Sequence, residues 1–312
     1  MIESPQTDVC IVEEAQNETE KLLLADKPRD PEVLLITNPP ITAKFYTAIR
    51  HLRSVAGPLA RFRGLHIALF YHLLYSFFTS CFRSLVPYPI QPVAAILASL
   101  LLCRIHMAWT HAMIAMPSSK RWWQRMPPIK SSATKQLLLP TAIWALAQQL
   151  CIGIPGALLV AAHDTFRDPG VSGGDQEKVK KIAVFQCFGV VIIFFTIVIG
   201  ILVPAEVSLK RVEASLLPED DKAIVPFDKT FSGKLKPAAL GGSGTLGMLN
   251  AWATFSKQSR IRLIKLYVKI FALQIAVAIL FVMIFVGELK MIAGPDFQRL
   301  VDIAHKSFKG EL

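Results

Sequence analysis

Charged residues and cysteines are both scarce in this chain. Asp, Glu, Lys and Arg make up 18% of the 312 residues and hydrophobic residues make up 53%, a composition that leaves little room for a separate soluble catalytic domain. The five cysteines include no Cys-x-x-Cys pair, so the sequence predicts neither a disulfide framework nor a zinc site. His-Glu-x-x-His and Walker motifs are also absent. No enzymatic activity, metal site or cofactor is therefore predicted.

Long uncharged stretches are what the chain has in abundance. The clearest runs from Ile182 to Val203 without a charge, and a helix needs about 20 apolar residues to cross the hydrocarbon core of a bilayer. Pro140 and Pro155 interrupt another such stretch, which neighbouring helices and water can tolerate in a span. The sequence therefore predicts an all-α, multi-pass transmembrane helix bundle with interfacial amphipathic helices. Its five spans are expected at about residues 64–86, 92–116, 137–162, 182–203 and 266–287.

Positive charge alternates between the loops and predicts the orientation of the spans. Residues 44–63 and 117–136 each carry five basic residues and no acid, and residues 205–262 carry nine basic and six acidic residues. Residues 163–181 and the tail after Gly287 carry four of each sign. Because positive loops are retained on the side of insertion, the three basic segments are expected on one face. The net charge of +11 thus indicates membrane lipids as partners rather than nucleic acid.

The segments outside the spans have distinct compositions. Residues 1–38 are acidic and carry no signal-peptide core, so a disordered tail is expected there, and residues 291–312 form a second tail. Residues 205–262 are expected to form a positive-side loop that contains an interfacial helix over 248–265, where apolar and basic residues mix. The run from Lys120 to Arg125 has the same mixture, with two tryptophans, and is predicted to anchor at the interface.

Polar residues inside the expected spans are the main candidates for function, because a charge at mid-bilayer costs about 3 kcal/mol and normally faces a cavity or partner. Arg104 and His111 share a helical face, and His72 lies on a polar stripe of the first span. Together with Gln148 of the third span they are predicted to line a solute pathway. The alternative is a second span shifted towards Leu85–Cys103, which would leave Arg104 at the interface as an ordinary positive-side residue.

A short motif also recurs along the chain. Pro204 ends an apolar span and is followed by Glu206 and Arg211, and Pro39 and Pro117 precede similar basic segments. In this respect the sequence resembles the mitochondrial carrier family, as a degenerate member or distant relative, because carriers repeat Pro-x-acid-x-x-basic-x-basic after their odd helices. The resemblance implies a gate at Pro204, Glu206 and Arg211, and an opposite gate at Asp164 and Arg167. The sequence also resembles fungal multi-pass membrane proteins, which implies no activity.

These observations leave two functional interpretations open. The first is an atypical carrier that moves a small anionic solute past His72, Arg104, His111 and Gln148, as an intramembrane arginine would allow. The second is a non-enzymatic accessory or scaffold protein of an organelle membrane, which the lack of catalytic motifs fits equally well. The carrier resemblance implies a mitochondrial membrane, with the endoplasmic reticulum or another endomembrane as the alternative.

Overall fold

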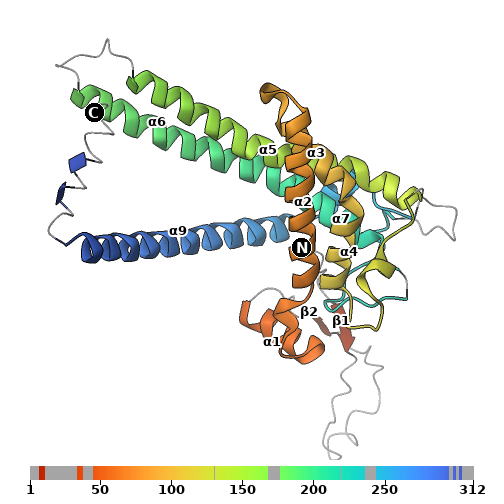
Figure 1. Ribbon diagram of the computed structural model, residues 1–312. Helices are drawn as coiled ribbons and strands as arrows, with labels where there is room; N and C mark the ends of the chain where they lie inside the picture. Colours follow the sequence, from red (N-terminus) through yellow and green to blue (C-terminus); the bar gives the residue numbers. More distant parts are fainter. Residues whose placement is uncertain are drawn as a thin grey trace, which may run out of the picture. The chain divides into compact units, whose positions relative to one another are not determined.

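The computed structural model describes residues 7–10, 34–37, 45–129, 131–167, 176–218, 220–235, 244–294, 298–299 and 302–303. Helices dominate these residues, which confirms the predicted all-α class (Figure 1). Two four-residue strands pair antiparallel, and the rest of the expected 1–38 tail and most of the 291–312 tail lie outside the described residues. The strands are β1 (Thr7–Cys10) and β2 (Leu34–Thr37), and the α-helices are α1 (Phe45–Ala56), α2 (Leu65–Leu85), α3 (Pro92–Leu101), α4 (Cys103–Ile114), α5 (Ser132–Arg167), α6 (Gln176–Ile197), α7 (Val203–Ser215), α8 (Met248–Ala253) and α9 (Lys257–Ala293). Short 3-10 turns are η2 (Ala60–Phe62), η3 (Tyr88–Ile90) and η4 (Trp122–Arg125), and η5 (Val198–Leu202) is a π-helical turn.

Four helical stretches among the described residues are long and apolar enough to cross a membrane. A fifth results if the α3–α4 pair, which bends by 61°, counts as one span. The protein is therefore a multi-pass membrane protein, as predicted. The four stretches are Ala60–Leu85, Ser132–Ala162, Phe185–Ser215 and Lys257–Ile292.

The helix expected to end before Pro204 instead continues to Ser215. The π-helical turn η5 lies directly before α7, whose first turn contains Pro204. Proline has no N–H to donate and its ring crowds the preceding turn, and a π turn is a common way to relieve such strain without ending a helix. The positive-side loop expected from residue 205 consequently begins only after α7.

The interfacial helix expected over 248–265 is divided in two. α8 ends at Ala253, and α9 begins at Lys257 and runs on into the last span without a break. Ser256 stands between them, and its side chain accepts a hydrogen bond from the Ser259 N–H at 3.2 Å. Such N-cap bonding starts a new helix, which explains the separation.

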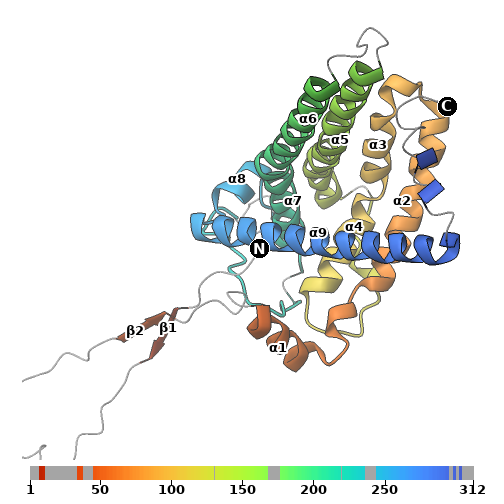
Figure 2. The ribbon, with the colours of Figure 1, turned by 90° about the vertical axis from the view of Figure 1, so that its left-hand side faces the viewer.

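Helix packing in residues 1–255 concentrates at one end of the bundle. α5 packs against α3, α6 and α7, and α2 packs against α3 (Figure 2). The buried face of α3 consists of alanines and a serine, small residues that let neighbouring helices approach closely. A buried apolar cluster joins α4, α5, α7, α8 and the loop after α7. Its members are Cys103, Met107, Leu137, Val212, Ala214, Phe231, Leu246 and Ala251.

Residues from Ser256 onward form a separate unit built on α9. The side chains of α9 from Ile275 to Phe285 are all apolar and exposed. A single helix of this kind is suited to lipid on every side, since no water-facing polar stripe interrupts it.

Gly64 provides a test of how α2 is placed against α4. Gly64 has a φ of +74°, and a Cβ there would lie 3.0 Å from Trp109 Cδ1 and 3.3 Å from Met113 Cγ. We expect Gly64→Ala to lower the thermal unfolding midpoint in detergent, because backbone strain of about 1–3 kcal/mol adds to the steric clash. Gly57→Ala is the matched control, since Gly57 has a φ of +84° and nothing within 4 Å of its Cβ position. Equal shifts for the two variants would show that α2 does not pack against Trp109.

Candidate functional site

A fully buried carboxylate lies between α4 and α7. Glu213 of α7 is 0% exposed, and its two carboxylate oxygens contact α4. His106 Nδ1 lies 2.5 Å from Oε1, and the Thr110 hydroxyl donates to Oε2 at 2.6 Å. Lys210, three residues before Glu213, places its Nζ 3.6 Å from Oε2. We refer to His106, Thr110, Lys210 and Glu213 as the buried cluster.

Hydrogen-bond directions within the buried cluster form two routes from Lys210 to Glu213. A lysine ammonium only donates and an ionised carboxylate only accepts. Lys210 Nζ therefore donates to Thr110 Oγ1 at 2.9 Å and to His106 Nε2 at 3.3 Å. His106 accepts at Nε2 and must carry its proton on Nδ1, which donates to Glu213. The arrangement can thus move a proton between the lysine and the carboxylate through the histidine.

Aromatic rings surround the imidazole of His106, which is 3% exposed. The centroid of its ring lies 5.4 Å from that of Tyr71 of α2, 5.7 Å from that of Trp109 of α4 and 5.0 Å from that of Trp144 of α5. Lys210 Nζ lies over the Trp109 ring at 5.4 Å from its centroid, a favourable cation–π geometry. Low polarity around the cluster strengthens the attraction between its charges.

His111 holds Glu213 a second time, through the main chain. Its Nε2 donates to the carbonyl oxygen of Glu213 at 2.7 Å, and His111 is 1% exposed. This carbonyl belongs to the last turn of α7, where carbonyls lack the usual partner four residues on, and it also accepts from the Leu216 N–H at 3.2 Å. His111 Nδ1 is buried and has no hydrogen-bond partner in the part of the chain that the structure describes. α4 therefore fixes both the side chain and the main chain of one residue.

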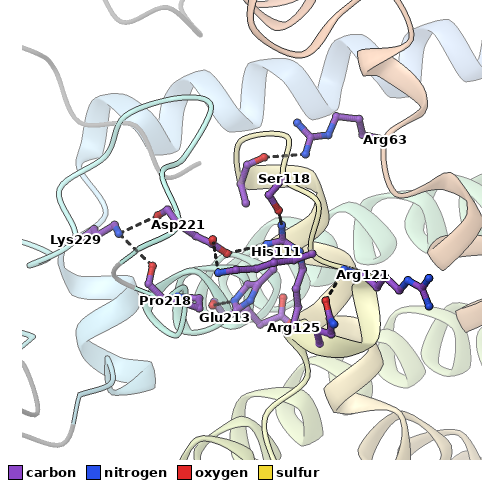
Figure 3. A network of polar contacts seen from close by, with 12 residues as sticks. Arg63, His111, Ser118, Arg121, Arg125, Glu213, Pro218, Asp221 and Lys229 are labelled. Atoms are coloured by element: carbon purple, nitrogen blue, oxygen red, sulfur yellow. Dashed lines mark hydrogen bonds and ion pairs between the residues drawn. The ribbon is translucent and has the colours of Figure 1, made fainter.

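A second polar network lies next to His111 and joins two basic loops (Figure 3). Asp221 accepts from Lys120 Nζ at 2.9 Å and from Arg125 Nη1 at 3.0 Å. Burial acts to raise the pKa of Asp221, but the Lys120 hydrogen bond and the Arg125 and Lys120 charges outweigh burial and hold it below its ordinary value. Lys229 Nζ donates to the Asp221 carbonyl oxygen at 3.1 Å. The loop after α7 is thereby fastened to the segment between α4 and α5.

Main-chain pairing reinforces this junction. Ala115 and Ala223 form an antiparallel bridge, the Ile224 N–H donates to the Ile114 carbonyl at 2.9 Å, and the Met116 N–H donates to the Lys222 carbonyl at 2.7 Å. These bonds satisfy main-chain N–H and C=O groups of both segments at the junction.

The residues that the sequence predicts to line a solute pathway have different surroundings. His72 is exposed and its ring contacts Tyr71 and Trp109. Arg104 is half-buried and its Nε donates to the Pro127 carbonyl at 2.8 Å, in the basic loop. His111 contacts Glu213, and Gln148 is half-buried on α5. The four side chains thus share no contact with one another in the interactions that the structure describes.

The residues of the expected gates have other surroundings. Arg211 is 6% exposed, donates from Nη2 to Thr254 Oγ1 at 2.8 Å, and stacks on Phe231 and Phe255 at 4.9 and 5.7 Å. Pro204 and Glu206 are half-buried on the same helix. The residues of the predicted gate therefore lie on one helical segment, and Arg211 contacts residues that follow α7 in the sequence. The side chains of Asp164 and Arg167 lie outside the described residues.

Sequence reasoning missed the centre of the site, namely His106, Lys210 and Glu213. His106 and Thr110 are four residues apart and Lys210 and Glu213 are three apart, spacings that place each pair on one helix face. This spacing indicates a shared face only where the segment is helical. Residues 205–215 were expected to be loop, so the pairing of Lys210 with Glu213 was not predicted.

Comparison of the chain with protein-family models, with curated proteins and with solved structures finds no match in any of the three. What is established is the class, a multi-pass membrane protein with a helical bundle, and the carrier resemblance stays a prediction. In the described residues, no group of three or more His, Cys, Asp or Glu side chains is placed to hold a metal ion.

Removal of the Glu213 charge should destabilise the protein strongly. In Glu213→Gln, Lys210 loses its counter-charge and the His106 Nδ1–H loses a charged acceptor, and breaking a buried ion pair in this way costs about 3–5 kcal/mol. We expect a large fall in the unfolding midpoint of purified protein in detergent. Asp220→Asn is the matched control, because Asp220 is an exposed acid seven residues further along the chain and should unfold like the wild type. A Glu213→Gln midpoint equal to that of the control would contradict the burial of the charge.

Asp221 should make stability depend on acid pH. Since its pKa is lower in the folded state, Asp221 stabilises the fold above its unfolded pKa of about 3.9, and this contribution is lost as the pH falls through the lowered value. The difference in unfolding midpoint between wild type and Asp221→Asn should therefore be present near neutral pH and shrink below about pH 4. Thermal unfolding across this pH range measures the difference, and a constant gap at all pH values would exclude the role of the Asp221 charge.

Proposed function

We propose that this membrane protein is a carrier for a small anionic solute and that the buried cluster is its binding centre. The observation that supports this most is Glu213, a carboxylate with no exposed surface inside a helix apolar enough to span a bilayer. Ionisable groups in such helices are costly and usually mark a pathway or a paired site. Lys210 and His106 supply the donors that an anion of similar geometry would require.

The chemistry follows from competition for these donors. A solute carboxylate that reaches Lys210 would compete with Glu213 for its charge and with Thr110 and His106 for its hydrogen bonds, and the two carboxylates would repel each other in a site of low polarity. Glu213 could then accept a proton through His106, whose Nδ1 contacts it directly. A loaded and an empty state would thus differ in the contacts between α4 and α7, as alternating access by a carrier requires.

The second candidate is a non-enzymatic accessory or scaffold protein. Support for it comes from the closure of the buried cluster, in which His106 and Thr110 already hold both carboxylate oxygens of Glu213 and Lys210 pairs with its charge. The different surroundings of His72, Arg104 and Gln148 support it as well. In this interpretation the cluster serves only to fix α4 against α7. An intracellular membrane is proposed as the location, mitochondrial by the carrier resemblance and the endoplasmic reticulum otherwise, which fractionation of a tagged copy distinguishes.

Thermal unfolding with small carboxylates separates the two candidates. We expect succinate, citrate or glutamate at millimolar concentration to raise the unfolding midpoint of purified wild-type protein and of the Asp220→Asn control. Lys210→Gln should lose this shift because it removes the main cationic donor. Proteoliposomes would then be tested for uptake of the labelled carboxylate that stabilises most.

The outcomes are distinct. A shift in the wild type that disappears in Lys210→Gln, followed by uptake into proteoliposomes, supports the carrier. Absence of any shift, or a shift that Lys210→Gln retains, contradicts the proposed binding centre and leaves the accessory role as the better account.

A further inference from the structure

Basic side chains gather where the start of α2 meets the loop between α4 and α5. Arg63 immediately precedes the Gly64 cap of α2, and its Nη2 donates to the Ala115 carbonyl at 2.9 Å. Its Nη1 is buried and has no hydrogen-bond partner among the residues that the structure describes. A buried guanidinium N–H without an acceptor is unfavourable and uncommon in folded proteins. Its presence here indicates that an acceptor from outside the chain belongs at this position.

Arg125 and Ser118 lie across the same loop from Arg63 (Figure 3). The Arg125 side chain is 6% exposed, and its Nη2 donates to Ser118 Oγ at 2.7 Å. Because Ser118 Oγ is an acceptor in this bond, the proton of its own hydroxyl remains available for another acceptor. One buried donor without an acceptor and one exposed hydroxyl with a free proton are thus placed around one loop.

Positive charge exceeds negative charge among the side chains around this loop. Arg63, Lys120 and Arg125 carry three positive charges. In the described part of the chain Asp221 is the one acid that pairs with any of them, and it contacts Lys120 and Arg125. Arg63 and Arg125 donate to Ala115 and Ser118, which are three residues apart in one segment. A partly buried group with this excess favours an anion, and paired guanidinium groups match the oxygens of phosphate particularly well.

Neighbouring aromatic residues place this group near the level of lipid headgroups. Trp122 of η4 contacts Phe70 of α2 with ring centroids 5.5 Å apart. Trp123 is 47% exposed, and the Arg121 guanidinium lies over its ring at 5.1 Å. Exposed tryptophan beside arginine at the end of an apolar helix is typical of the boundary between membrane and water.

We propose that Arg63, Ser118 and Arg125 form a binding site for a phosphate group at the basic face of the bundle. Arg63 Nη1 and the Ser118 hydroxyl donate to the phosphate oxygens, while Arg125 positions Ser118 and adds positive charge. Lys120, whose side chain is 44% exposed, can reach the same anion from the solvent side. The phosphate can belong to an anionic lipid headgroup or to a soluble phosphate ester.

Titration in a phosphate-free maltoside detergent tests this site. Short-chain phosphatidic acid is titrated into the purified full-length protein, and inorganic phosphate is titrated separately, with the dissociation constant measured in each case. We expect Ser118→Ala and Arg63→Gln each to weaken binding by about tenfold, the effect of losing one charge-assisted hydrogen bond. Ser84→Ala, at the other end of α2, and Arg53→Gln, on an exposed face of α1, are the matched controls for hydroxyl and charge.

Each result has a definite meaning. Binding of phosphatidic acid but not of inorganic phosphate, weakened in the two site variants and unchanged in the controls, assigns the site to a lipid headgroup. Comparable binding of inorganic phosphate with the same variant pattern assigns it to a soluble phosphate. Equal binding by Ser118→Ala and the wild type overturns the proposal, and this variant decides alone if Arg63→Gln does not fold.

Discussion

The rest of this structure depends on the burial of the Glu213 carboxylate. A carboxylate removed from water is stable only when partners replace its hydration, and here every partner but one comes from α4. His106 and Thr110 hold the side-chain oxygens and His111 holds the main-chain oxygen. Glu213 therefore determines both the depth and the rotation of α7 relative to α4. A one-residue slip of either helix would leave charge buried without a partner.

This constraint explains why the chain is well packed at one end of its bundle. The apolar cluster around Met107, Leu137 and Val212 surrounds the contact between α4 and α7. The Asp221 network closes the same region from the loop side, with Lys120 and Arg125 from one basic loop and Asp221 from the other. Further along α5 and α6 the exposed side chains are apolar, as lipid contact requires. Polar interactions thus hold the helices and loops together at the basic face, whereas the spans are defined only by the length of their apolar stretches.

The sequence was sufficient to predict the spans, because a long uncharged apolar stretch has few other uses than crossing a bilayer. Expected bounds agree closely for α2, and they fall short for α5 and for the α6–α7 run because charged helical ends carry no hydropathy signal. The sequence could not predict the π turn before Pro204, because most helices end at a proline and only some extend past one. The division at Ser256 was also missed, although a serine before a basic amphipathic run is a known cap signal.

The candidate site was much less predictable than the fold. Arg104 drew attention because it interrupts an apolar run, yet the bend after α3 brings it to the Pro127 carbonyl at the edge of the basic loop. Glu213 and Lys210 stand in a segment with charges of both signs, where sequence alone indicates solvent. Only the tertiary contact with His106, more than a hundred residues earlier, shows that these charges are buried and paired.

The central claim is that His106 and Glu213 interact directly and thereby join α4 to α7. A double-mutant cycle tests it, with His106→Gln, Glu213→Gln and the double variant unfolded by rising fractions of sodium dodecyl sulfate in mixed micelles. Residues in direct contact show coupling energies of about 0.5–3 kcal/mol, and our account predicts a value in the upper half of this range because the pair is buried. Additive effects of the two substitutions would contradict it.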